Sequence, residues 1–597
     1  MQGLDGSRPF VLLDDARAGG AGVSRLFTHP RGVITAHMID QVPAALEQLR
    51  LAAALGRTAA GFISYEAGLA LESRLRPLYQ PPADDLPLIW MALFDSVEQL
   101  TPAQVASALP DAAGAWIGKP QPRIGYGEYQ ALVEQALALI AAGDIYQVNL
   151  TFQSLVHAEG DPLALYALLR RTSAAGWGGV VRTDRHWLLS ASPELFFTVE
   201  GGVITARPMK GTAGRGANLV SDGEAVETLR TDPKQRAENL MITDLIRNDL
   251  SRVAEPGSVN VPSLFDVETY PTIHQLTSTV TARLDEGLSP VDVLAAIFPC
   301  GSITGAPKIR AMEVIAALEG EARGAYTGGI GWLNRDESGF NVAIRTLVLP
   351  QEPGPAMLGL GSGIVADSEP ASEWGECLAK GAFVSAGNAP FDLIETMRFD
   401  PRDGIAYLAL HLRRLEASAS TFGFAFNRHN VRNELQAAVF TLRQPVRVRL
   451  LLGPSGATAI ETAPLPPPVI QPVSVALALL PVSSSDFRLR HKTTARGFYD
   501  QARRASGAHE IVFTDAGGML TEGSFTNIFV ERDGLLLTPP LHRGLLPGTL
   551  RQHLIDEGRA IEADLTPREL AGGFFIGNAL RGLMRAELVA TPASAGL

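Results

Sequence analysis

The sequence predicts at least two domains, each of the α+β class, and two observations carry that expectation. At 597 residues the chain is too long for a single hydrophobic core. Segments with the period-two alternation of strands and segments with helical spacing are mixed throughout, so each part should combine helices with a sheet.

Composition limits the classes of function. Hydrophobic residues at 46% and charged residues at 19% describe an ordinary soluble globular protein. The net charge of -12 argues against nucleic acid as a partner, because phosphate binding needs a basic face. Cys300 and Cys377 provide no disulfide framework and suit a reducing compartment. With neither a signal peptide nor an uncharged membrane-length apolar run in sight, we expect a cytoplasmic protein and no membrane partner.

Two breaks divide the chain. Residues 385–390 are small and precede a strand-like start, which places the expected domain boundary between residues 1–388 and 389–597. Residues 463–472 are too rich in proline for regular structure and should link two lobes of the second domain.

A helix and a strand are predicted early in the first domain. Residues 129–142 have apolar side chains at helical spacing, and Gly143 is a natural C-terminal stop. Residues 146–153 alternate with period two, which puts Gln147 and Asn149 on the face opposite Val148. The plain interpretation is an amphipathic strand with one wet face.

The helix that follows Asp232 has a well-marked start. Asp232 is the expected N-cap, a proline stands at the first helical position, and Gln235 would complete a capping box. Glu238, Met241 and Leu245 then fall on one face. A carboxylate on an apolar stripe costs several kcal/mol unless it is paired or metal-bound, so Glu238 is a functional candidate.

Other carboxylates have two interpretations each. Glu194 is either an exposed turn carboxylate after Pro193 or a buried acid, since the apolar residues 195–197 follow it. A carboxyl acts as a general acid near neutral pH only if burial raises its pKa. Glu373, Glu376 and Lys380 share a helical face, a pattern more often typical of a surface ion-pair ladder.

A Pro-Gly turn in the second domain predicts an anion site. It precedes residues 552–557, which we expect to be helical, and a helix N-terminus presents free N–H groups and a positive dipole end. Gly548 and Thr549 are the residues placed to bind a phosphate there.

The motifs of the first domain, taken in order, resemble the chorismate-utilising enzymes, an α/β sandwich fold. The segments that carry the resemblance are Gly-Asp-Ile-Tyr-Gln-Val-Asn-Leu (143–150), Ala-Ser-Pro-Glu-Leu-Phe-Phe (191–197), Pro-Met-Lys-Gly-Thr (208–212), residues 236–250, Gly-Ser-Ile-Thr-Gly-Ala-Pro-Lys (301–308), Asn-Val-Ala-Ile-Arg-Thr (341–346) and residues 361–380. Each is weak alone, but their common order makes the signal strong.

The resemblance implies particular roles. Lys210 would be the nucleophile, because aminodeoxychorismate synthases have lysine where anthranilate synthases typically have alanine. Glu194 would be the general acid, and Glu238 and Glu376 would be Mg²⁺ ligands. Gln147 stands where relatives that add water to the ring tend to have a lysine base, which points away from isochorismate chemistry. The implied substrate-binding residues are His274, Thr304, Arg345, Gly361, Gly363, Glu373 and Lys380.

The second domain resembles fold-type IV pyridoxal-phosphate proteins, which are two-lobed, and most closely the aminodeoxychorismate lyases. Phe-Asp-Leu-Ile-Glu-Thr-Met-Arg (391–398) and Leu-Thr-Glu-Gly-Ser-Phe-Thr-Asn (520–527) carry much of this resemblance. It implies that Lys492 bonds the cofactor and acts in catalysis, and that Glu522 faces the pyridinium nitrogen. The other implied cofactor-binding residues are Arg414, Gly548, Thr549 and Asn578.

Together the two resemblances imply an enzyme that makes 4-aminobenzoate, a folate precursor, from chorismate with Mg²⁺ and pyridoxal 5′-phosphate. Neither cysteine lies in a nucleophile-turn context, so a separate glutamine amidotransferase subunit is the implied ammonia source. A homodimer through the second domain is one assembly the resemblance allows. Two alternatives stay open: an anthranilate-type synthase fused to an aminotransferase, and a synthase with a non-catalytic C-terminal module.

Overall fold

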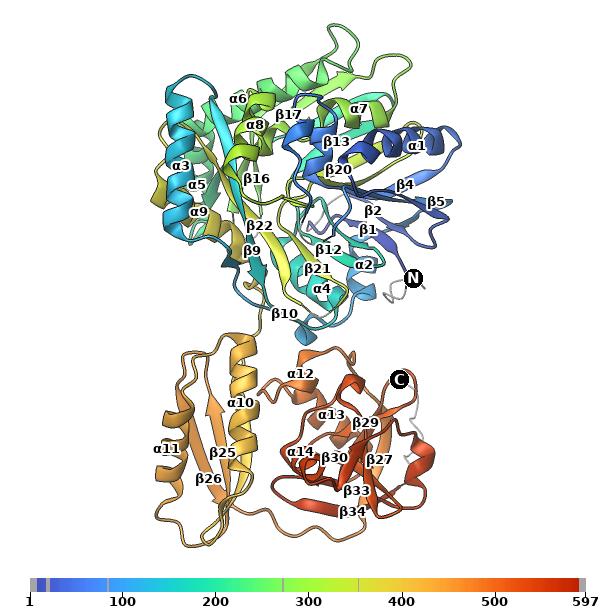
Figure 1. The fold of residues 1–597 in the computed structure, drawn as a ribbon, viewed down its shortest axis with the longest axis vertical. Coiled ribbons are helices and arrows are strands. Elements are labelled where there is room, and N and C mark those ends of the chain that lie inside the picture. The colour runs from blue at the N-terminus through green and yellow to red at the C-terminus, as the bar shows by residue number, and fades with distance from the viewer. Residues whose placement is uncertain (1–7, 18–21, 83–84, 271–272, 353, 590–597) are drawn as a thin grey trace. The chain divides into compact units, whose positions relative to one another are not determined.

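The computed structural model describes residues 8–17, 22–82, 85–270, 273–352 and 354–589. They form two compact units (Figure 1). The first unit contains the described residues up to Pro110, together with Lys119–Ala158 and Leu165–Gly387. The second unit contains Asp111–Gly118, Glu159–Ala164 and the described residues from Asn388 onward.

Two large antiparallel sheets build the first unit. In its described residues, the strand order of one sheet is β18 (Gly305–Ala306), β9 (Gln147–Val156), β22 (Ala356–Ile364), β21 (Thr346–Pro350), β12 (His186–Ser190), β11 (Gly178–Arg182), β1 (Phe10–Asp14), β2 (Ser24–Phe27) and β6 (Glu98–Leu100), with β8 (Gln121–Pro122) beside β9. The order of the other is β15 (Met209–Gly214), β17 (Ile273–Arg283), β14 (Val203–Arg207), β13 (Leu195–Glu200), β20 (Ser338–Val342), β19 (Gly329–Leu333), β4 (Thr58–Ile63), β5 (Ile89–Phe94) and β3 (Gly32–Ala36), with β16 (Asn260–Thr269) beside β17.

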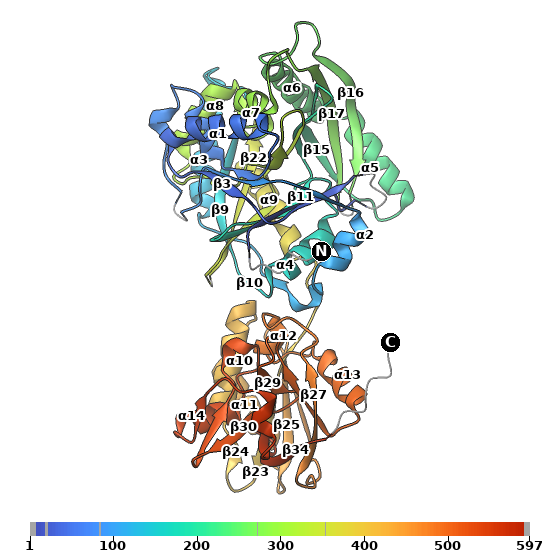
Figure 2. The same ribbon diagram turned by 90° about the vertical axis from the view of Figure 1, so that its right-hand side faces the viewer.

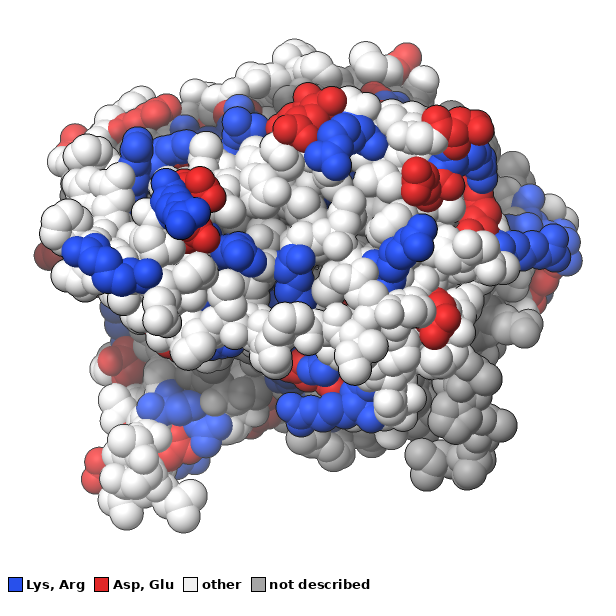
Figure 3. Space-filling view, turned by 90° about the horizontal axis from the view of Figure 1, so that it is seen from below, with Lys and Arg blue, Asp and Glu red and all other residues white. Residues whose placement is uncertain are grey.

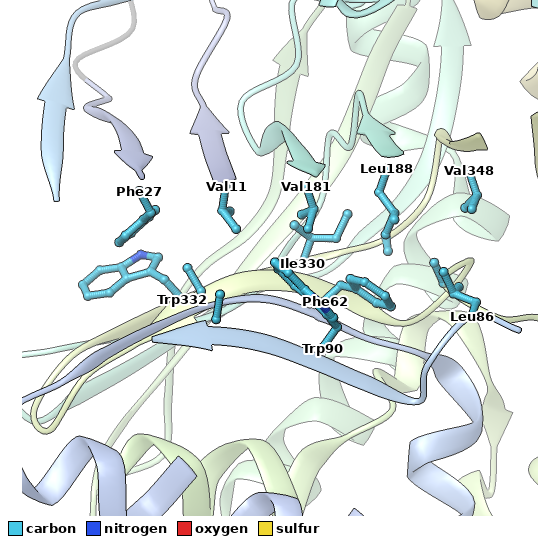
Figure 4. Close-up of a cluster of buried hydrophobic side chains, with 14 of the residues drawn as sticks. Val11, Phe27, Phe62, Leu86, Trp90, Val181, Leu188, Ile330, Trp332 and Val348 are labelled. Atoms are coloured by element: carbon cyan, nitrogen blue, oxygen red, sulfur yellow. The ribbon is translucent and has the colours of Figure 1, made fainter. Parts of the chain in front are cut away.

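The core of the first unit lies between these two sheets. Figure 4 shows Val11, Val181 and Leu188 of one sheet pointing toward side chains of the other sheet. Phe62 and Trp90 stack on the facing side with ring centroids 6.4 Å apart. Side chains that alternate along each strand therefore interdigitate, which makes this unit an α/β sandwich as the sequence predicts.

Helices cover the outer faces and the ends of these sheets (Figure 2). Helix α9 (Pro370–Gly381) packs on β22 and on α3 (Tyr126–Ala141), while α6 (Pro233–Leu250) packs on β15 and β17. Further helices of this unit are α1 (Val42–Ala54), α2 (Pro102–Ala108), α5 (Leu219–Thr231), α7 (Pro290–Ile297) and α8 (Lys308–Leu318). The predicted helix near residue 129 is confirmed, and Gly143 ends it at a positive φ of 81°.

Of the two features predicted for the start of α6, the structure confirms the N-cap but not the capping box. Asp232 Oδ1 accepts a hydrogen bond from the Gln235 backbone N–H at 2.8 Å, so the N-cap is confirmed. The expected capping box is wrong, because the Asp232 N–H instead donates to Thr228 O at 2.9 Å, at the end of α5. A residue that ends one helix and begins the next has no N–H left for the reciprocal bond.

Two side-chain positions also differ from the expectation. The buried face of α6 centres on Asn239, Ile242 and Ile246, so Glu238 is half-buried on its flank. The expected wet face of β9 is wrong at Gln147, which is fully buried, and Tyr146 lies outside the strand. A sheet buried on both faces explains why alternation there does not mark a solvent side.

The described residues of the second unit form two main sheets, one in each of two lobes, and β7 (Trp116–Ile117) pairs with β10 (Ala158–Glu159) in a further two-stranded sheet. The first lobe has the strand order β24 (Gly404–Ile405), β23 (Leu393–Asp400), β25 (Val446–Leu452), β26 (Thr458–Pro464), and the second has β29 (Leu520–Gly523), β28 (Glu510–Thr514), β27 (Val473–Leu479), β34 (Gly582–Leu588), β33 (Phe574–Asn578), β30 (Asn527–Arg532), β31 (Leu535–Thr538), β32 (Ala560–Glu562). The helices are α10 (Leu408–Phe422), α11 (Arg428–Val439), α12 (Phe487–Arg490), α13 (Gly497–Ser506) and α14 (Thr549–Asp556). Residues 465–472 are irregular as predicted, but Ala463 and Pro464, also expected to be irregular, end β26.

A short segment from the first half of the sequence packs within the second unit. The Trp116 ring meets the Phe422 ring edge-on at 4.9 Å, and the Asn388 side chain exchanges hydrogen bonds with the Ile117 backbone. We propose residues 1–388 and 389–597 as the two functional domains, with this segment contributing to the core of the second.

The charged surface is mixed. In the face shown in Figure 3, Lys and Arg side chains are interspersed with Asp and Glu among uncharged residues. Among the helices of the described residues, none is both long enough and apolar enough to cross a membrane.

Two candidate active sites

Polar side chains of the first unit converge on Gly363 in β22. A β-carbon placed on Gly363 would lie 2.7 Å from Lys210 Nζ. It would also lie 2.9 Å from Asn149 Oδ1 and 3.1 Å from Gln147 Nε2. Any larger residue at this position would therefore displace Lys210 or the two amides, so the strand brings its backbone up to the candidate nucleophile because it carries glycine there.

The surroundings of Lys210 favour an unprotonated amine. Burial lowers the pKa of Lys210, and the ammonium group of Lys380 lowers it further. The carboxylates Glu238, Glu376 and Glu194 oppose this, but the pKa remains below its ordinary value. A lysine must lose its proton to act as a nucleophile, so these surroundings suit that chemistry.

Glu194 is the buried acid that one of the two interpretations predicts. It is 4% exposed among Leu195, Phe196 and Phe197, which are themselves buried. Burial raises the pKa of Glu194 to about 7, although the Ser302 hydroxyl donates to Oε1 at 2.7 Å and the Lys210 charge lowers it. A carboxyl that retains its proton near neutral pH can donate it to a leaving hydroxyl.

The pKa of Glu194 predicts a pH-dependent loss of stability. Its pKa rises from an ordinary 4.5 to about 7 on folding, so between these values the unfolded state ionises while the folded state stays protonated. The free energy of unfolding should therefore fall by about 3 kcal/mol as pH rises through this window. Glu194→Gln should reduce the wild-type loss by this amount, while other buried acids with a raised pKa, such as Glu522, keep their own share. Urea unfolding at pH 5 and pH 8 would measure the difference.

The matched control is Glu200→Gln, which removes an exposed carboxylate at the end of β13, the strand that begins directly after Glu194. That variant should keep the wild-type change in stability between the two pH values. If Glu194→Gln also keeps it, the carboxyl does not have the raised pKa.

Two carboxylates lie near Lys210 in a position to bind a cation. Burial raises the pKa of Glu238 on α6, and the nearby Glu376 carboxylate on α9 raises it further, against the charge of Lys210. Burial also raises the pKa of Glu376, but Lys380, whose Nζ is 2.7 Å from Glu376 Oε1, lowers it overall. The two acids are thus close enough to influence each other.

This donor set fits Mg²⁺. Within the described residues, no group of three or more His, Cys, Asp or Glu side chains gathers as a metal site. Mg²⁺ commonly takes one or two protein carboxylates and completes its octahedron with water and substrate oxygens. Glu238 and Glu376 would supply the protein's share.

Arg345 is a cation that lacks a carboxylate partner among the described residues. Its guanidinium is largely buried beside the Phe383 ring, 5.9 Å from the centroid, and burial lowers its pKa. A buried cation without a counter-ion is costly, so an anionic ligand would stabilise it. Lys380 Nζ also donates to Gly361 O at 3.1 Å, which ties α9 to β22.

Three of the predicted substrate residues form hydrogen bonds with neighbouring protein groups. His274 is buried with both ring nitrogens engaged, by Asp222 and by Thr269, each at 2.9 Å. The Thr304 hydroxyl donates to the carbonyls of its own turn, including Cys300 O at 3.2 Å. Glu373 accepts a hydrogen bond from Ser368 Oγ at 2.7 Å. Of the three residues on the predicted helical face, Glu376 and Lys380 form an ion pair.

Sequence reasoning did not single out the amide of Asn149. Asn149 Oδ1 and both polar side-chain atoms of Gln147 are buried without a hydrogen-bond partner among the described residues. Both side chains lie beside Lys210, and buried polar groups are normally satisfied. The period-two spacing of the two amides on β9 was the signal that could have grouped them.

The second unit has a cavity of about 600 Å³, lined by residues from both lobes. Lys492 lies in this cavity, and burial lowers its pKa to about 7. The charges of Arg414, Arg496 and Arg449 also lower it, whereas Glu395 raises it. A lysine that is partly neutral near pH 7 is suited to attack a carbonyl and to remove a proton.

Glu522 lies in the same cavity on β29. It is 2% exposed, and burial raises its pKa to about 7. Glu522 accepts a hydrogen bond from the Tyr499 hydroxyl and another from the Leu546 backbone N–H at 3.0 Å. A buried carboxyl held by two donors is poised to ionise when a positive ring nitrogen approaches it.

Arg414 is held by a carboxylate that the sequence did not mark. Its Nε donates to Glu395 Oε1 at 2.8 Å, and Glu395 also contacts His411 Nδ1 at 2.6 Å. Burial raises the pKa of Glu395, but Arg414 and His411 lower it overall, so this carboxylate remains charged. Arg414 also donates to Pro547 O at 3.0 Å, beside the predicted phosphate turn.

The predicted helix after the Pro-Gly turn begins earlier than expected. Helix α14 starts at Thr549, not at Gln552, with Gly548 as its N-cap. A β-carbon on Gly548 would lie 1.8 Å from Asn527 Oδ1, so only glycine fits beside that side chain. Both residues of the predicted phosphate site therefore stand directly at the helix N-terminus, where N–H groups are free to bind an anion.

Asn578 lines the cavity but is occupied structurally. Its Nδ2 donates to Phe525 O at 3.1 Å, and its Oδ1 accepts from the backbone N–H groups of Leu580 and Arg581. It therefore shapes the turn before β34 at the rim of the site.

This arrangement fits pyridoxal phosphate in three respects. A lysine with a lowered pKa, a buried carboxyl and a helix N-terminus all line one cavity. Lys492 would bond the cofactor aldehyde, Glu522 would face the ring nitrogen, and Gly548 and Thr549 would bind the phosphate.

Comparison with known proteins defines the class. Residues 8–386 match the family model for chorismate binding enzymes, and the chain belongs to that family. Residues 392–589 match the model for class IV amino-transferases, so the second unit is a class IV aminotransferase-like domain. The predicted combination of folds is confirmed.

Particular relatives narrow the comparison. The chain is 47% identical over 257 residues to aminodeoxychorismate synthase component 1 of Klebsiella aerogenes, covering 42% of this chain and 56% of the relative. It is 42% identical over 260 residues to anthranilate synthase component 1 of Streptomyces coelicolor, covering 42% and 50%. The chain thus spans about half the length of these curated relatives.

A solved structure is also similar. Anthranilate synthase component I of Streptococcus pneumoniae aligns with a TM-score of 0.53 and 27% identity, covering 62% of this chain and 93% of that chain. The first unit therefore has the fold of this family, and its reaction must be decided from the site residues.

Proposed function

We propose that the chain makes 4-aminobenzoate from chorismate in two steps, one at each candidate site. The first converts chorismate to 4-amino-4-deoxychorismate, and the second removes pyruvate from that product. The single observation that carries the proposal is Lys210, a lysine with a lowered pKa that lies beside the buried acid Glu194.

In the first step, the neutral amine of Lys210 attacks ring C2 of chorismate. Glu194 protonates the C4 hydroxyl, which leaves as water while the ring double bonds shift. Ammonia then adds at C4 and expels the Lys210 amine from C2, and the Glu194 carboxylate takes up the proton that the incoming nitrogen loses. Arg345 and Lys380 bind substrate carboxylates.

Mg²⁺ supplies positive charge that holds the substrate carboxylates, and Glu238 with Glu376 would bind it. Glu238 and Glu376 both lie near Lys210. A metal bound by these two acids would therefore contact the same substrate molecule that Lys210 attacks.

In the second step, Lys492 removes the proton from ring C4 of the aminated product. The bond from ring C3 to the enolpyruvyl oxygen breaks, pyruvate leaves, and the ring becomes aromatic. Pyridoxal phosphate supplies the electron sink that makes this proton acidic. Glu522 would stabilise positive charge at the cofactor's ring nitrogen, and the Tyr499 hydroxyl orients Glu522.

A separate glutamine amidotransferase would supply the ammonia. Both cysteines are buried, and burial raises the pKa of the Cys300 thiol to about 12, which does not suit a nucleophile. The name "component 1" of the relative from Klebsiella aerogenes supports a second component.

Supplying 4-amino-4-deoxychorismate to the protein loaded with pyridoxal phosphate tests the second site against its rivals. We expect pyruvate and 4-aminobenzoate in equal amounts. Exchange of the amino group with an added keto acid would instead favour an aminotransferase. A protein that binds no cofactor and releases no pyruvate would favour a non-catalytic module.

A further inference from the structure

The cavity of the second unit has an arginine on its wall that the proposed mechanism does not use. Along β25, Val448 and Leu450 point into the core of the first lobe, while Arg447 and Arg449 alternate with them and line the cavity. Arg449 pairs in register with Thr396, another cavity residue, on the neighbouring strand β23. A cation on this wall thus belongs to the site and not to the outer surface.

Arg449 differs from Arg447, Arg503 and Arg414 in having no carboxylate partner among the described residues. Arg447 is 3.0 Å from Glu461, Arg503 is 3.1 Å from Asp500, and Arg414 is held by Glu395. The Nε atoms of Arg449, Arg447 and Arg503 are all buried and donate to no acceptor in the described part of the chain, but of these three side chains Arg449 is the one without a carboxylate partner. Such a group is costly unless a ligand satisfies it.

We propose that Arg449 binds a carboxylate of the molecule that the second site transforms. A guanidinium presents two parallel N–H donors that match a carboxylate, and a buried position strengthens the interaction. The inference rests on the proposed function, because the carboxylate is taken to be one of the two that 4-amino-4-deoxychorismate carries. Stated without a particular substrate, the proposal is that this cavity binds an anionic substrate and that Arg449 contacts its negative group.

The other cations of the cavity are already committed. Arg414 lies toward the phosphate turn, where it donates to Pro547 O. Arg496 stacks over the Tyr499 ring at 4.3 Å and donates to Arg488 O. Arg581 donates to Pro467 O at 3.1 Å. Arg449 is therefore the cavity arginine best placed to take a carboxylate without breaking an existing contact.

Arg449 is also close to the reacting lysine. The charge of Arg449 lowers the pKa of Lys492, although burial and the charges of Arg414 and Arg496 lower it more. A carboxylate bound at Arg449 would consequently lie near Lys492, which places the rest of the substrate ring within the cavity. The same closeness makes the pH dependence of the bound cofactor's absorbance a second readout of this side chain.

The test compares Arg449→Gln with Arg428→Gln, which removes the same charge from an arginine of the same lobe that pairs with Glu416 and does not line the cavity. With 4-amino-4-deoxychorismate as substrate, we expect Arg449→Gln to raise KM by about tenfold to a hundredfold, the range for losing one charge-assisted carboxylate contact. Arg428→Gln should change KM by less than about threefold. Arg449→Lys should restore part of the loss.

A binding measurement separates this inference from the proposed function. Chorismate carries two carboxylates but no amine, so it should perturb the visible absorbance of the bound cofactor without turnover, and Arg449→Gln should weaken that binding about tenfold or more. Weakened chorismate binding in a protein whose wild type does not turn over 4-amino-4-deoxychorismate would sink the proposed function and leave the carboxylate site standing. Unchanged KM and unchanged chorismate binding in Arg449→Gln would overturn the inference, provided the cofactor absorbance shows a folded site.

Discussion

Lys210→Ala should lower the rate of 4-amino-4-deoxychorismate formation on the order of a thousandfold or more, because removing a covalent nucleophile leaves only positioning and charge stabilisation. Chorismate binding should change little, since Arg345, Lys380 and the metal carboxylates remain. Product formation from chorismate and ammonium, with the dissociation constant of chorismate measured separately, checks both parts.

The second site supplies the control for this variant. Because the second unit has its own core, Lys210→Ala should still release pyruvate from supplied 4-amino-4-deoxychorismate at the wild-type rate. Wild-type turnover of chorismate in Lys210→Ala would show that Lys210 is not the nucleophile. Loss of both activities would indicate misfolding and would call for Lys210→Arg, which keeps the charge and removes the nucleophilic amine.

Lys492→Ala should stop pyruvate release from supplied 4-amino-4-deoxychorismate, again on the order of a thousandfold or more. Lys492 is the cavity lysine whose pKa burial lowers to about 7, and no other lysine lines that cavity within the described residues. Incubation with chorismate and ammonium should then accumulate 4-amino-4-deoxychorismate, since the first site is intact. The visible absorbance of the bound cofactor should be lost as well.

Borohydride reduction distinguishes Lys492 from any other attachment point. In the wild type, reduction in the presence of pyridoxal phosphate should fix the cofactor on the peptide that contains Lys492. In Lys492→Ala no peptide should be labelled. A label on another lysine in either protein would mean that the wrong residue was assigned.

Some features of the two sites could be predicted from residues that are neighbours in the sequence. The apolar residues after Glu194 indicated burial as one of two interpretations, and burial is what raises its pKa. The Pro-Gly pair that ends at Gly548 predicted a turn before a helix, although α14 begins at Thr549, three residues earlier than expected. Signals of this kind depend on neighbours in the chain.

Contacts between distant segments could not be predicted in the same way. Glu395 is an ordinary strand residue in the sequence, but β23 brings it to Arg414 and His411 on α10, nineteen and sixteen positions away. Nothing local marks Lys492, whose pKa depends on burial between two lobes. His274 was assigned by resemblance alone, and its bond to Asp222, 52 positions away, appears only in the fold.

The most direct test of the account is the product that the purified chain makes from chorismate, ammonium, Mg²⁺ and pyridoxal phosphate. We predict 4-aminobenzoate and pyruvate in equal amounts, and accumulation of 4-amino-4-deoxychorismate when pyridoxal phosphate is withheld from the cofactor-free protein. Adding a glutamine amidotransferase partner should let glutamine replace ammonium. Anthranilate as the aromatic product would contradict the account, because the amine would then stand at C2, the position that Lys210 is proposed to occupy.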